Sequence, residues 1–222
     1  NIIGNEIYTN EELLDGFELS EGSFFSFLSN DNQYSREKLK GDIESLESFY
    51  RDRGYLKFSI ESSQISLSRD KKLIFITFNV NEGEKYTIND VDVVGEIPFD
   101  EDVYIDIVNR LKDTTYSQAQ ITSIEEFFTN VLGNRGYAFA EVVGNPEINE
   151  ATNEVKLIFS VQPGNRTYTR KILFTGNDIT QDYVLRREMR QFEGAWTSDN
   201  SIEAGKVRLE RLGYFKEVNV ET

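Results

Sequence analysis

The segment Asn134-Arg135-Gly136-Tyr137 ends an amphipathic stretch and begins a β-rich one. Its Gly-Tyr pair recurs at Gly54-Tyr55 and at Gly213-Tyr214, so the three occurrences lie roughly 80 residues apart. A glycine at this place is suited to the left-handed turn that commonly ends a helix. The spacing therefore predicts three copies of one structural unit, each with a helix that ends at the Gly-Tyr pair.

Two further markers recur in the same register. A glycine ends a β-rich run before a polar residue in every copy, at Gly4, Gly95 and Gly176. A glycine also stands shortly before a Tyr-Thr pair twice, in Glu82-Gly83 and Pro163-Gly164. Because three independent markers share one period, the sequence predicts a tandem repeat.

The middle copy shows the order of elements within the unit. Residues Tyr86 to Val94 alternate as in a strand, and apolar residues from Val103 to Leu111 recur three or four apart as on a helix face. Ser117 and Gln120 have the capping-box spacing and begin a second helix that ends before Gly136. Two strands follow, Tyr137–Val143 and Glu154–Val161. The expected unit is therefore β-α-α-β-β.

The first copy repeats this order. Thr9 and Glu12 form a second capping-box pattern, and a further helix carries an apolar stripe from Leu39 to Tyr50. Strands are expected at Leu56–Leu67 and Leu73–Val80, joined by a turn at 68–72. The insertion Phe24–Leu28 between the two helices is expected to pack into this copy's own core or a junction, with a partner-binding patch as the alternative.

The third copy is shorter. It contains a strand pattern at Tyr168–Thr175, helical patterns near Tyr183–Phe192 and Ser201–Leu212, and one further strand pattern at Phe215–Val220. The final strand of the unit is missing from it. The domain boundaries expected from the markers are 1–83, 84–164 and 165–222, hereafter the first, second and third modules. Since the junctions are only two or three residues long, neighbouring modules are expected to touch, as in a semi-rigid rod.

The composition excludes several classes of function. The formal net charge is −15, which repels phosphate backbones and argues against nucleic acid as a partner. The chain has no cysteine and no histidine, so thiolate nucleophiles, imidazole bases and the usual zinc ligands are all lacking. No carboxylate pair stands out either. We therefore expect a protein that is not an enzyme and that carries no cofactor or metal.

Longer motifs in the three copies resemble one known family. The strongest is the block from Val184 to Trp196, which reads VLRREMRQFEGAW, and it is preceded by Phe174-x-Gly176-Asn177. Arg135-Gly136-Tyr137-Ala138 and Tyr50-x-Asp52-Arg53-Gly54-Tyr55 carry the likeness in the other copies. These motifs resemble the POTRA modules of the outer-membrane protein assembly factors, in the order of the third, fourth and fifth modules. Glu96 departs from the asparagine that usually follows the glycine.

The resemblance implies an α+β fold of tandem POTRA modules, each with a three-stranded mixed sheet covered by two helices on one face. It implies a scaffold arm in the periplasm of a Gram-negative bacterium, held near the outer membrane by a C-terminal barrel outside these residues. The implied partners are BamD-like assembly lipoproteins and unfolded outer-membrane proteins. The alternatives are the POTRA arm of a two-partner secretion transporter and a structural or adhesive spacer repeat.

The strand after each Gly-Tyr pair is an edge strand in this family, and the first copy has the least protected one. It has no proline, no glycine and one charge, whereas the second copy's strand is interrupted by Gly144 and Pro146. We expect this edge to bind partner strands by β-augmentation, and a solvated serine-rich surface is the alternative. The candidate residues are Phe58, Ser59, Ile60, Glu61, Ser62, Ser63, Gln64, Ile65, Ser66 and Leu67.

Charge is distributed unevenly among the copies. The acidic excess lies in the first two, whereas the third is close to neutral and carries several arginines. Helical spacing would place these arginines and one glutamate on a charged stripe, which is either a solvated face or, as the resemblance favours, a docking surface for a lipoprotein. The candidate residues are Arg186, Arg187, Arg190 and Glu193.

Overall fold

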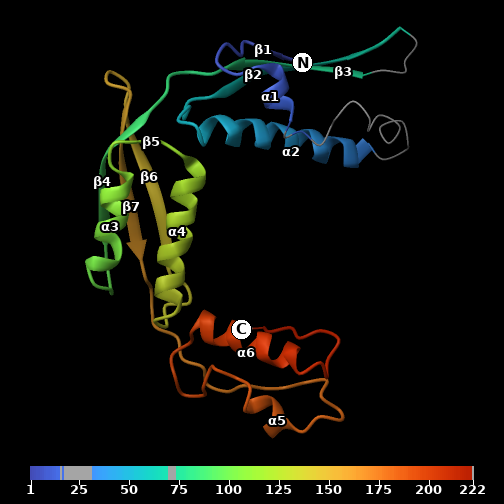
Figure 1. The fold of residues 1–222 in the computed structure, drawn as a ribbon, viewed down its shortest axis with the longest axis vertical. Helices are drawn as coiled ribbons and strands as arrows, with labels where there is room; N and C mark the ends of the chain where they lie inside the picture. Colours follow the sequence, from blue (N-terminus) through green and yellow to red (C-terminus); the bar gives the residue numbers. More distant parts are fainter. Residues whose placement is uncertain (16, 18–31, 70–73, 222) are drawn as a thin grey trace. The chain divides into compact units, whose positions relative to one another are not determined.

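The computed structural model describes residues 1–15, 17, 32–69 and 74–221 (Figure 1). The Phe24–Leu28 insertion and most of the turn at 68–72 lie outside these ranges. The chain divides into two compact units. The first contains Asn1–Val91, Val108–Ile121 and Pro146–Leu157, and the second contains Asp92–Ile107, Thr122–Asn145 and Ile158–Thr222. Each unit includes one of the two junctions between modules.

The first module has the predicted order of elements. Thr9 caps its first helix through a capping box, in which Thr9 accepts the N–H of Glu12 and the Glu12 carboxylate accepts the N–H of Thr9. The elements are β1 (Ile2–Ile3), α1 (Asn10–Leu14), α2 (Asn32–Arg51), β2 (Ser59–Leu67) and β3 (Ile74–Asn81).

The first sheet is mixed, as predicted, and has the strand order β1-β3-β2. β1 pairs with β3 in parallel, with Ile2 opposite Phe78. β2 pairs with β3 in antiparallel register from Ser59 opposite Asn81 onward, with a bulge between Ile60 and Ser62. The last strand of the module is therefore the central one, and β2 lies at an edge.

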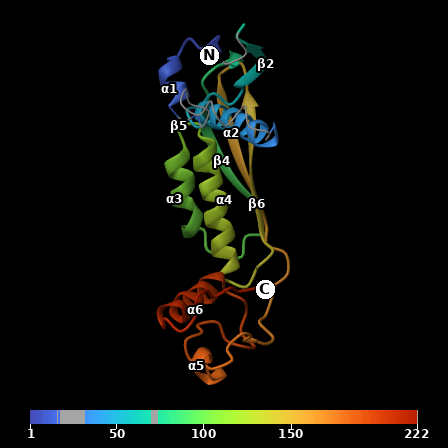
Figure 2. The ribbon, with the colours of Figure 1, turned by 90° about the vertical axis from the view of Figure 1, so that its right-hand side faces the viewer.

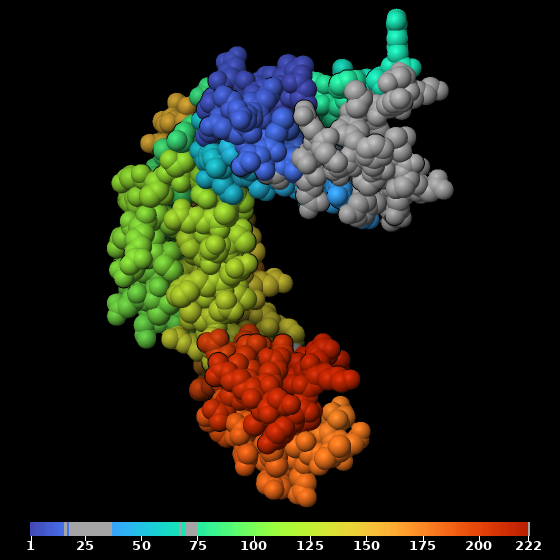
Figure 3. All heavy atoms as spheres, turned by 45° about the vertical axis from the view of Figure 1, so that its right-hand side comes forward, coloured from blue at the N-terminus to red at the C-terminus, as the bar shows by residue number. Residues whose placement is uncertain are grey.

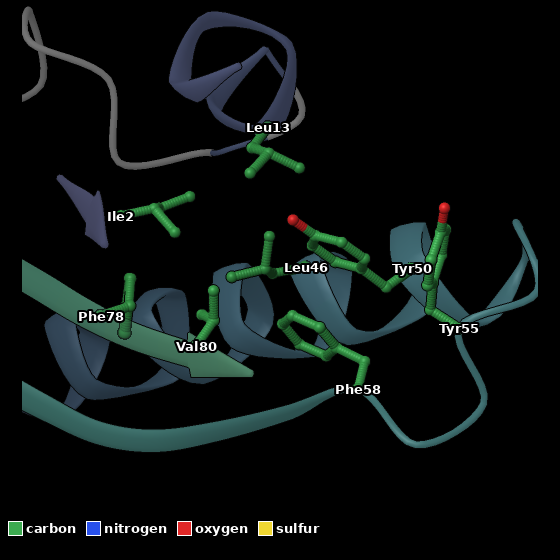
Figure 4. Packing of buried hydrophobic residues seen from close by; sticks show 8 residues of the cluster. All are labelled: Ile2, Leu13, Leu46, Tyr50, Tyr55, Phe58, Phe78 and Val80. Atoms are coloured by element: carbon green, nitrogen blue, oxygen red, sulfur yellow. The ribbon is translucent and has the colours of Figure 1, made fainter. Parts of the chain in front are cut away.

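One hydrophobic cluster holds the helices of this module on the sheet. Figure 4 shows its side chains from α1, α2 and the strands pointing toward one another. Tyr50 is completely buried and stacks on Phe58, with ring centroids 4.1 Å apart. The buried members are Ile2, Leu13, Leu46, Tyr50, Tyr55, Phe58, Phe78 and Val80.

A carboxylate is buried beside this cluster. The Glu82 side chain accepts hydrogen bonds from the backbone N–H groups of Glu6 and Ile7 and, at 2.7 Å, from the Tyr50 hydroxyl. Burial of the Tyr50 ring and the bond to Glu82 raise the pKa of the Tyr50 hydroxyl far above its ordinary value. This polar node therefore ties the start of the chain to α2 and to the end of β3.

The second module also has the predicted order, with one addition. Its sheet has the order β5-β4-β7-β6, and α3 and α4 lie on one face of it (Figures 1 and 2). The two-residue β5 was not predicted, because so short a strand leaves no periodicity to detect. The elements are β4 (Thr87–Gly95), α3 (Asp102–Leu111), β5 (Thr114–Thr115), α4 (Gln118–Gly133), β6 (Glu141–Asn149) and β7 (Glu154–Gln162).

The prediction for β6 was wrong in its position. The strand was expected at Tyr137–Val143 and was expected to be interrupted at Gly144 and Pro146, but it runs through both residues to Asn149. Because β6 is an edge strand, the missing N–H of Pro146 can be accommodated on the unpaired side of the sheet. The residues before Glu141 form a turn instead.

The third module differs most from the prediction. Among its described residues there are two helices, α5 (Asp182–Arg186) and α6 (Asp199–Arg211), and no strand beyond an isolated bridge between Tyr168 and Trp196. The strands expected at Tyr168–Thr175 and Phe215–Val220 are therefore not formed. In the other two modules the last strand is central and pairs with both of its neighbours, and no described residue of the third module takes that place.

The helix expected at Tyr183–Phe192 also ends early, at Arg186. The residues after it turn back, so that the Glu193 carboxylate reaches the N–H of Ile172. This tertiary bond outweighs the local helical pattern. A small core of Leu185, Met189 and Leu209 joins the two helical regions, which lie against each other in Figure 3.

Candidate partner-binding surfaces

The β2 strand presents an unpaired edge. β3 occupies one side of it, and among the described strands nothing pairs with the other side. Every second residue of such a strand directs its N–H and C=O away from the sheet. The nine residues of β2 therefore offer a row of main-chain donors and acceptors that an extended peptide can bind.

The side chains of β2 are open to solvent along most of the strand. All residues from Glu61 to Ser66 are exposed, and Ile65 is 59% exposed. Ile60 packs partly against the core. Phe58, which was predicted to belong to the edge, precedes the strand and is buried against Tyr50, so its side chain is not available to a partner.

The other edges of the two sheets are shorter or blunted. β1 and β5 contain two residues each. β6 is as long as β2 but includes Pro146, which has no N–H to donate, and two glutamates, Glu141 and Glu147. β2 has neither proline nor glycine, and Glu61 is its single charge. It is therefore the edge best suited to main-chain pairing among the described strands.

The four charged candidates of the third module do not form a helical stripe, which corrects the prediction. Arg186 is the last residue of α5 and Arg187 caps it, whereas Arg190 and Glu193 lie beyond the helix. The structure nevertheless brings Arg186 and Glu193 together, with Nη1 3.0 Å from Oε1. All four residues are exposed.

Arg186 and Glu193 form part of the module's own framework. Arg186 donates to the carbonyl oxygen of Ile172 at 2.8 Å and to the carboxylate of Asp182 at 2.5 Å. Glu193 accepts the N–H of Ile172 at 2.8 Å. This backbone N–H and the Arg186 guanidinium lower the pKa of the Glu193 carboxyl. The pair therefore holds the segment around Ile172 against α5.

A second charged node joins the residues just after α5 to α6. The Glu188 carboxylate accepts bonds from Arg208, at 2.7 and 3.1 Å, and from Arg187, at 3.2 Å. The hydrogen bond from Arg208, and to a smaller extent the one from Arg187, lower the pKa of the Glu188 carboxyl. Neither Glu188 nor Asp182 was among the predicted site residues. The spacing of four residues between Asp182 and Arg186 was a signal that could have revealed the second of them.

In the part of the chain that the structure describes, no helix is both long enough and apolar enough to cross a membrane.

Comparison with family models gives one match that repeats along the chain. The model described as "POTRA: Surface antigen variable number repeat" matches residues 1–83, 86–164 and 167–222.

Curated proteins and solved structures agree with this match. The outer membrane protein assembly factor BamA of Buchnera aphidicola is 32% identical over 219 residues, which are 99% of this chain and 36% of that protein. BamA of Neisseria meningitidis serogroup B is 31% identical over 221 residues, 98% of this chain and 28% of that protein. The chain therefore spans about a third of the length of these relatives. The crystal structure of Haemophilus influenzae BamA POTRA3-5 superposes with a TM-score of 0.78 at 27% identity, covering 99% of this chain and 86% of that one.

Proposed function

The chain belongs to the POTRA family, and on that premise we propose that it forms a periplasmic scaffold arm of an outer-membrane protein assembly factor in a Gram-negative bacterium. One observation carries this proposal: the chain matches BamA relatives over nearly its whole length and superposes on the third to fifth POTRA modules of one of them. The arm would position unfolded outer-membrane proteins and assembly lipoproteins and would perform no chemistry itself.

The first module would receive unfolded client strands along β2. Main-chain hydrogen bonds supply the affinity in β-augmentation and tolerate many client sequences. A long edge without proline or glycine provides such bonds, and its exposed serines place few steric or charge demands on the client. Beyond the bulge between Ile60 and Ser62, β2 pairs with the central strand β3 in regular register from Ser62 to Leu67.

Proline substitutions at Ser63 and Gln64 test this edge. Of two successive strand residues, one N–H faces β3 and the other faces away. The variant that loses the N–H facing β3 breaks a hydrogen bond between the two strands, so we expect it to lower the unfolding midpoint. The variant that loses the N–H facing away from the sheet is expected to stay folded. The folded variant is expected to lose about tenfold in affinity for a urea-denatured outer-membrane barrel protein diluted into buffer, measured by fluorescence anisotropy.

The control for this experiment is Gln64→Thr, which changes the side chain but keeps the N–H. It is expected to bind the client as the wild type does. Undiminished client binding by the folded proline variant would show that β2 does not receive the client.

The third module would dock an assembly lipoprotein of the BamD type through Arg186, Arg187, Arg190 and Glu193. These exposed charges lie on a module that lacks the acidic excess of the other two. Arg186, Arg187 and Glu193 also bond within the module. Arg190 is therefore the better residue with which to test docking.

Charge reversal at Arg190 is expected to weaken binding of a purified BamD-type lipoprotein by about threefold to tenfold, mainly through slower association. Surface plasmon resonance at two salt concentrations measures this. Arg110→Glu, an exposed reversal on α3, serves as the matched control. If both reversals change the association rate equally, the effect is one of net charge and the docking surface lies elsewhere.

A further inference from the structure

The Gly-Tyr turn of the first module is in contact with the second module, as the short junction predicted. The carbonyl oxygen of Gly54 accepts the N–H of Tyr86 at 2.9 Å. The carbonyl oxygen of Tyr86 in turn accepts the N–H of Tyr116 at 3.1 Å. A chain of backbone hydrogen bonds thus runs from the end of α2 to the residues that precede α4.

A side chain completes this junction. The Asp52 carboxylate, two positions before Gly54, accepts the N–H of Ala119 at 2.7 Å. Ala119 is the second residue of α4, whose own cap, Ser117, accepts the N–H of Gln120 at 3.3 Å. The first N–H groups of a helix have no partner within it, and a negative charge there is favourable. Asp52 therefore supplies part of the cap of a helix in the next module.

The junction between the second and third modules repeats the backbone bonds. The carbonyl oxygen of Gly136 accepts the N–H of Thr167 at 2.7 Å, and that of Thr167 accepts the N–H of Thr197 at 3.0 Å. Tyr86 and Thr167 each stand three residues after a glycine with positive φ, Gly83 and Gly164. The two backbone hydrogen bonds of the second junction therefore correspond to the two of the first.

The side-chain cap is repeated too. Asn134, two positions before Gly136, accepts the N–H of Asn200 at 3.0 Å and lies 3.1 Å from the Ser198 hydroxyl. Asn200 is the second residue of α6, and Ser198 is the N-cap, which accepts the N–H of Ser201 at 3.3 Å. Aspartate and asparagine both carry a side-chain oxygen at the same position, and this oxygen accepts the helix N–H. Asp52 and Asn134 can therefore cap the next module's helix in the same way.

The glycines of the first two turns also make room for the next module. A Cβ at Gly54 would lie 2.8 Å from Cγ2 of Thr115, and one at Gly136 would lie 2.8 Å from Cβ of Trp196. The residue two positions before Gly213 is Arg211, whose guanidinium can donate but cannot accept a hydrogen bond. The third turn therefore lacks the group that caps a following helix.

We propose that the Gly-Tyr turn is the docking surface for the second helix of the following module, and that the residue two positions before its glycine decides whether such a helix can dock. Asp52 and Asn134 are positioning residues, since they fix the next module through its helix N-terminus. An arginine at this position excludes a helix N-terminus, because two donors and two positive charges would face each other.

The single tryptophan of the chain reports on the second junction. Trp196 lies against Gly136, and the Arg166 guanidinium lies 4.7 Å from its ring centroid. We expect Asn134→Ala and Asn134→Arg to shift the emission maximum to longer wavelength and to raise acrylamide quenching of the full chain about twofold. Asn134→Asp, which places the residue of the first junction in the second, is expected to match the wild type.

The first junction is measured with spin labels, because the chain has no cysteine of its own. Labels at Ser45→Cys on α2 and Asn109→Cys on α3 lie on opposite sides of the junction within the first unit. Asp52→Arg is expected to widen the distance distribution at least twofold, and Asp52→Asn is expected to leave it unchanged. Arg211→Ala is the control at the corresponding position of the third turn.

Two results would overturn the proposal. One is a distance distribution for Asp52→Arg as narrow as that of the wild type, together with unchanged Trp196 emission in Asn134→Arg. The other is an equal effect of the conservative and the arginine substitutions: Asp52→Asn widens the distance distribution as much as Asp52→Arg, and Asn134→Asp shifts the Trp196 emission as much as Asn134→Arg. In that case the shared side-chain oxygen would not be what matters.

Discussion

Replacement of Gly95 by alanine is expected to destabilise the second module by about 4 kcal/mol, which is near the upper end for single substitutions. Gly95 ends β4 with φ +107°, a left-handed conformation that side chains disfavour. A Cβ there would also lie 2.2 Å from the carbonyl oxygen of Val161 on the neighbouring strand. Because that oxygen belongs to the backbone of β7, relief requires the two strands to separate. Chemical denaturation followed by circular dichroism measures the loss.

The first module offers a matched pair for this prediction. Gly4 has φ +92° and its Cβ would lie 2.3 Å from the carbonyl oxygen of Val80, whereas a Cβ at Gly41 on α2 would meet nothing within 4 Å. Gly4→Ala is therefore expected to destabilise strongly, and Gly41→Ala to stabilise by about 0.5 to 1 kcal/mol through its helix propensity. Equal effects of the two substitutions would contradict the account of the glycine marker.

Replacement of Glu82 by alanine is the second large effect, with an expected loss of about 3 kcal/mol in the free energy of unfolding of the first module. The substitution leaves the N–H groups of Glu6 and Ile7 and the hydroxyl of Tyr50 without their common acceptor. Tyr50→Phe removes one of the three donors and is expected to cost about 1 to 2 kcal/mol. Urea denaturation of the full chain measures both.

Glu84→Ala is the control for Glu82, because Glu84 lies two residues away and is exposed. It is expected to change stability by less than about 0.5 kcal/mol. If the two alanine variants had the same stability, the buried carboxylate would not organise the first module as described.

The repeat itself could be predicted from the sequence, because its recurring glycines stand at backbone positions that other residues fit poorly. Gly4, Gly54, Gly95 and Gly136 all have positive φ, and side chains are excluded at each of them by a close neighbour. Because only glycine fits such positions well, a glycine is found at each of them when the unit recurs. The order β-α-α-β-β followed from the same periodicities; the first module has it, and the second has it with β5 added between the helices.

What the sequence did not show depends on contacts between distant residues. The bonds of Glu82 to Glu6 and Ile7 join residues that are 76 and 75 positions apart, nearly the whole length of the first module, and no local pattern records them. The early end of α5 follows from the bonds between Glu193, Arg186 and Ile172 rather than from helix propensity. A strand in the third module needs a central partner, and periodicity describes only the strand itself.

The two candidate surfaces were predictable to different degrees. The β2 edge needed only the absence of proline and glycine and the strand order of the unit, although Phe58 belongs to the core and not to the edge. The charged surface depended on an assumed helix that stops at Arg186. The junctions were predicted to exist, but the bonds from Asp52 and Asn134 to the next module could be found only in three dimensions.

Residue-resolved hydrogen exchange of the β2 amides, with and without an unfolded outer-membrane barrel protein, tests the central claim most directly. If the first module receives client strands, exchange at the outward-facing amides between Ser59 and Leu67 slows at least about tenfold at saturating client, while the amides of β6 keep their rates. Unchanged exchange along β2 with the client bound would contradict the claim that this edge is the client's binding site.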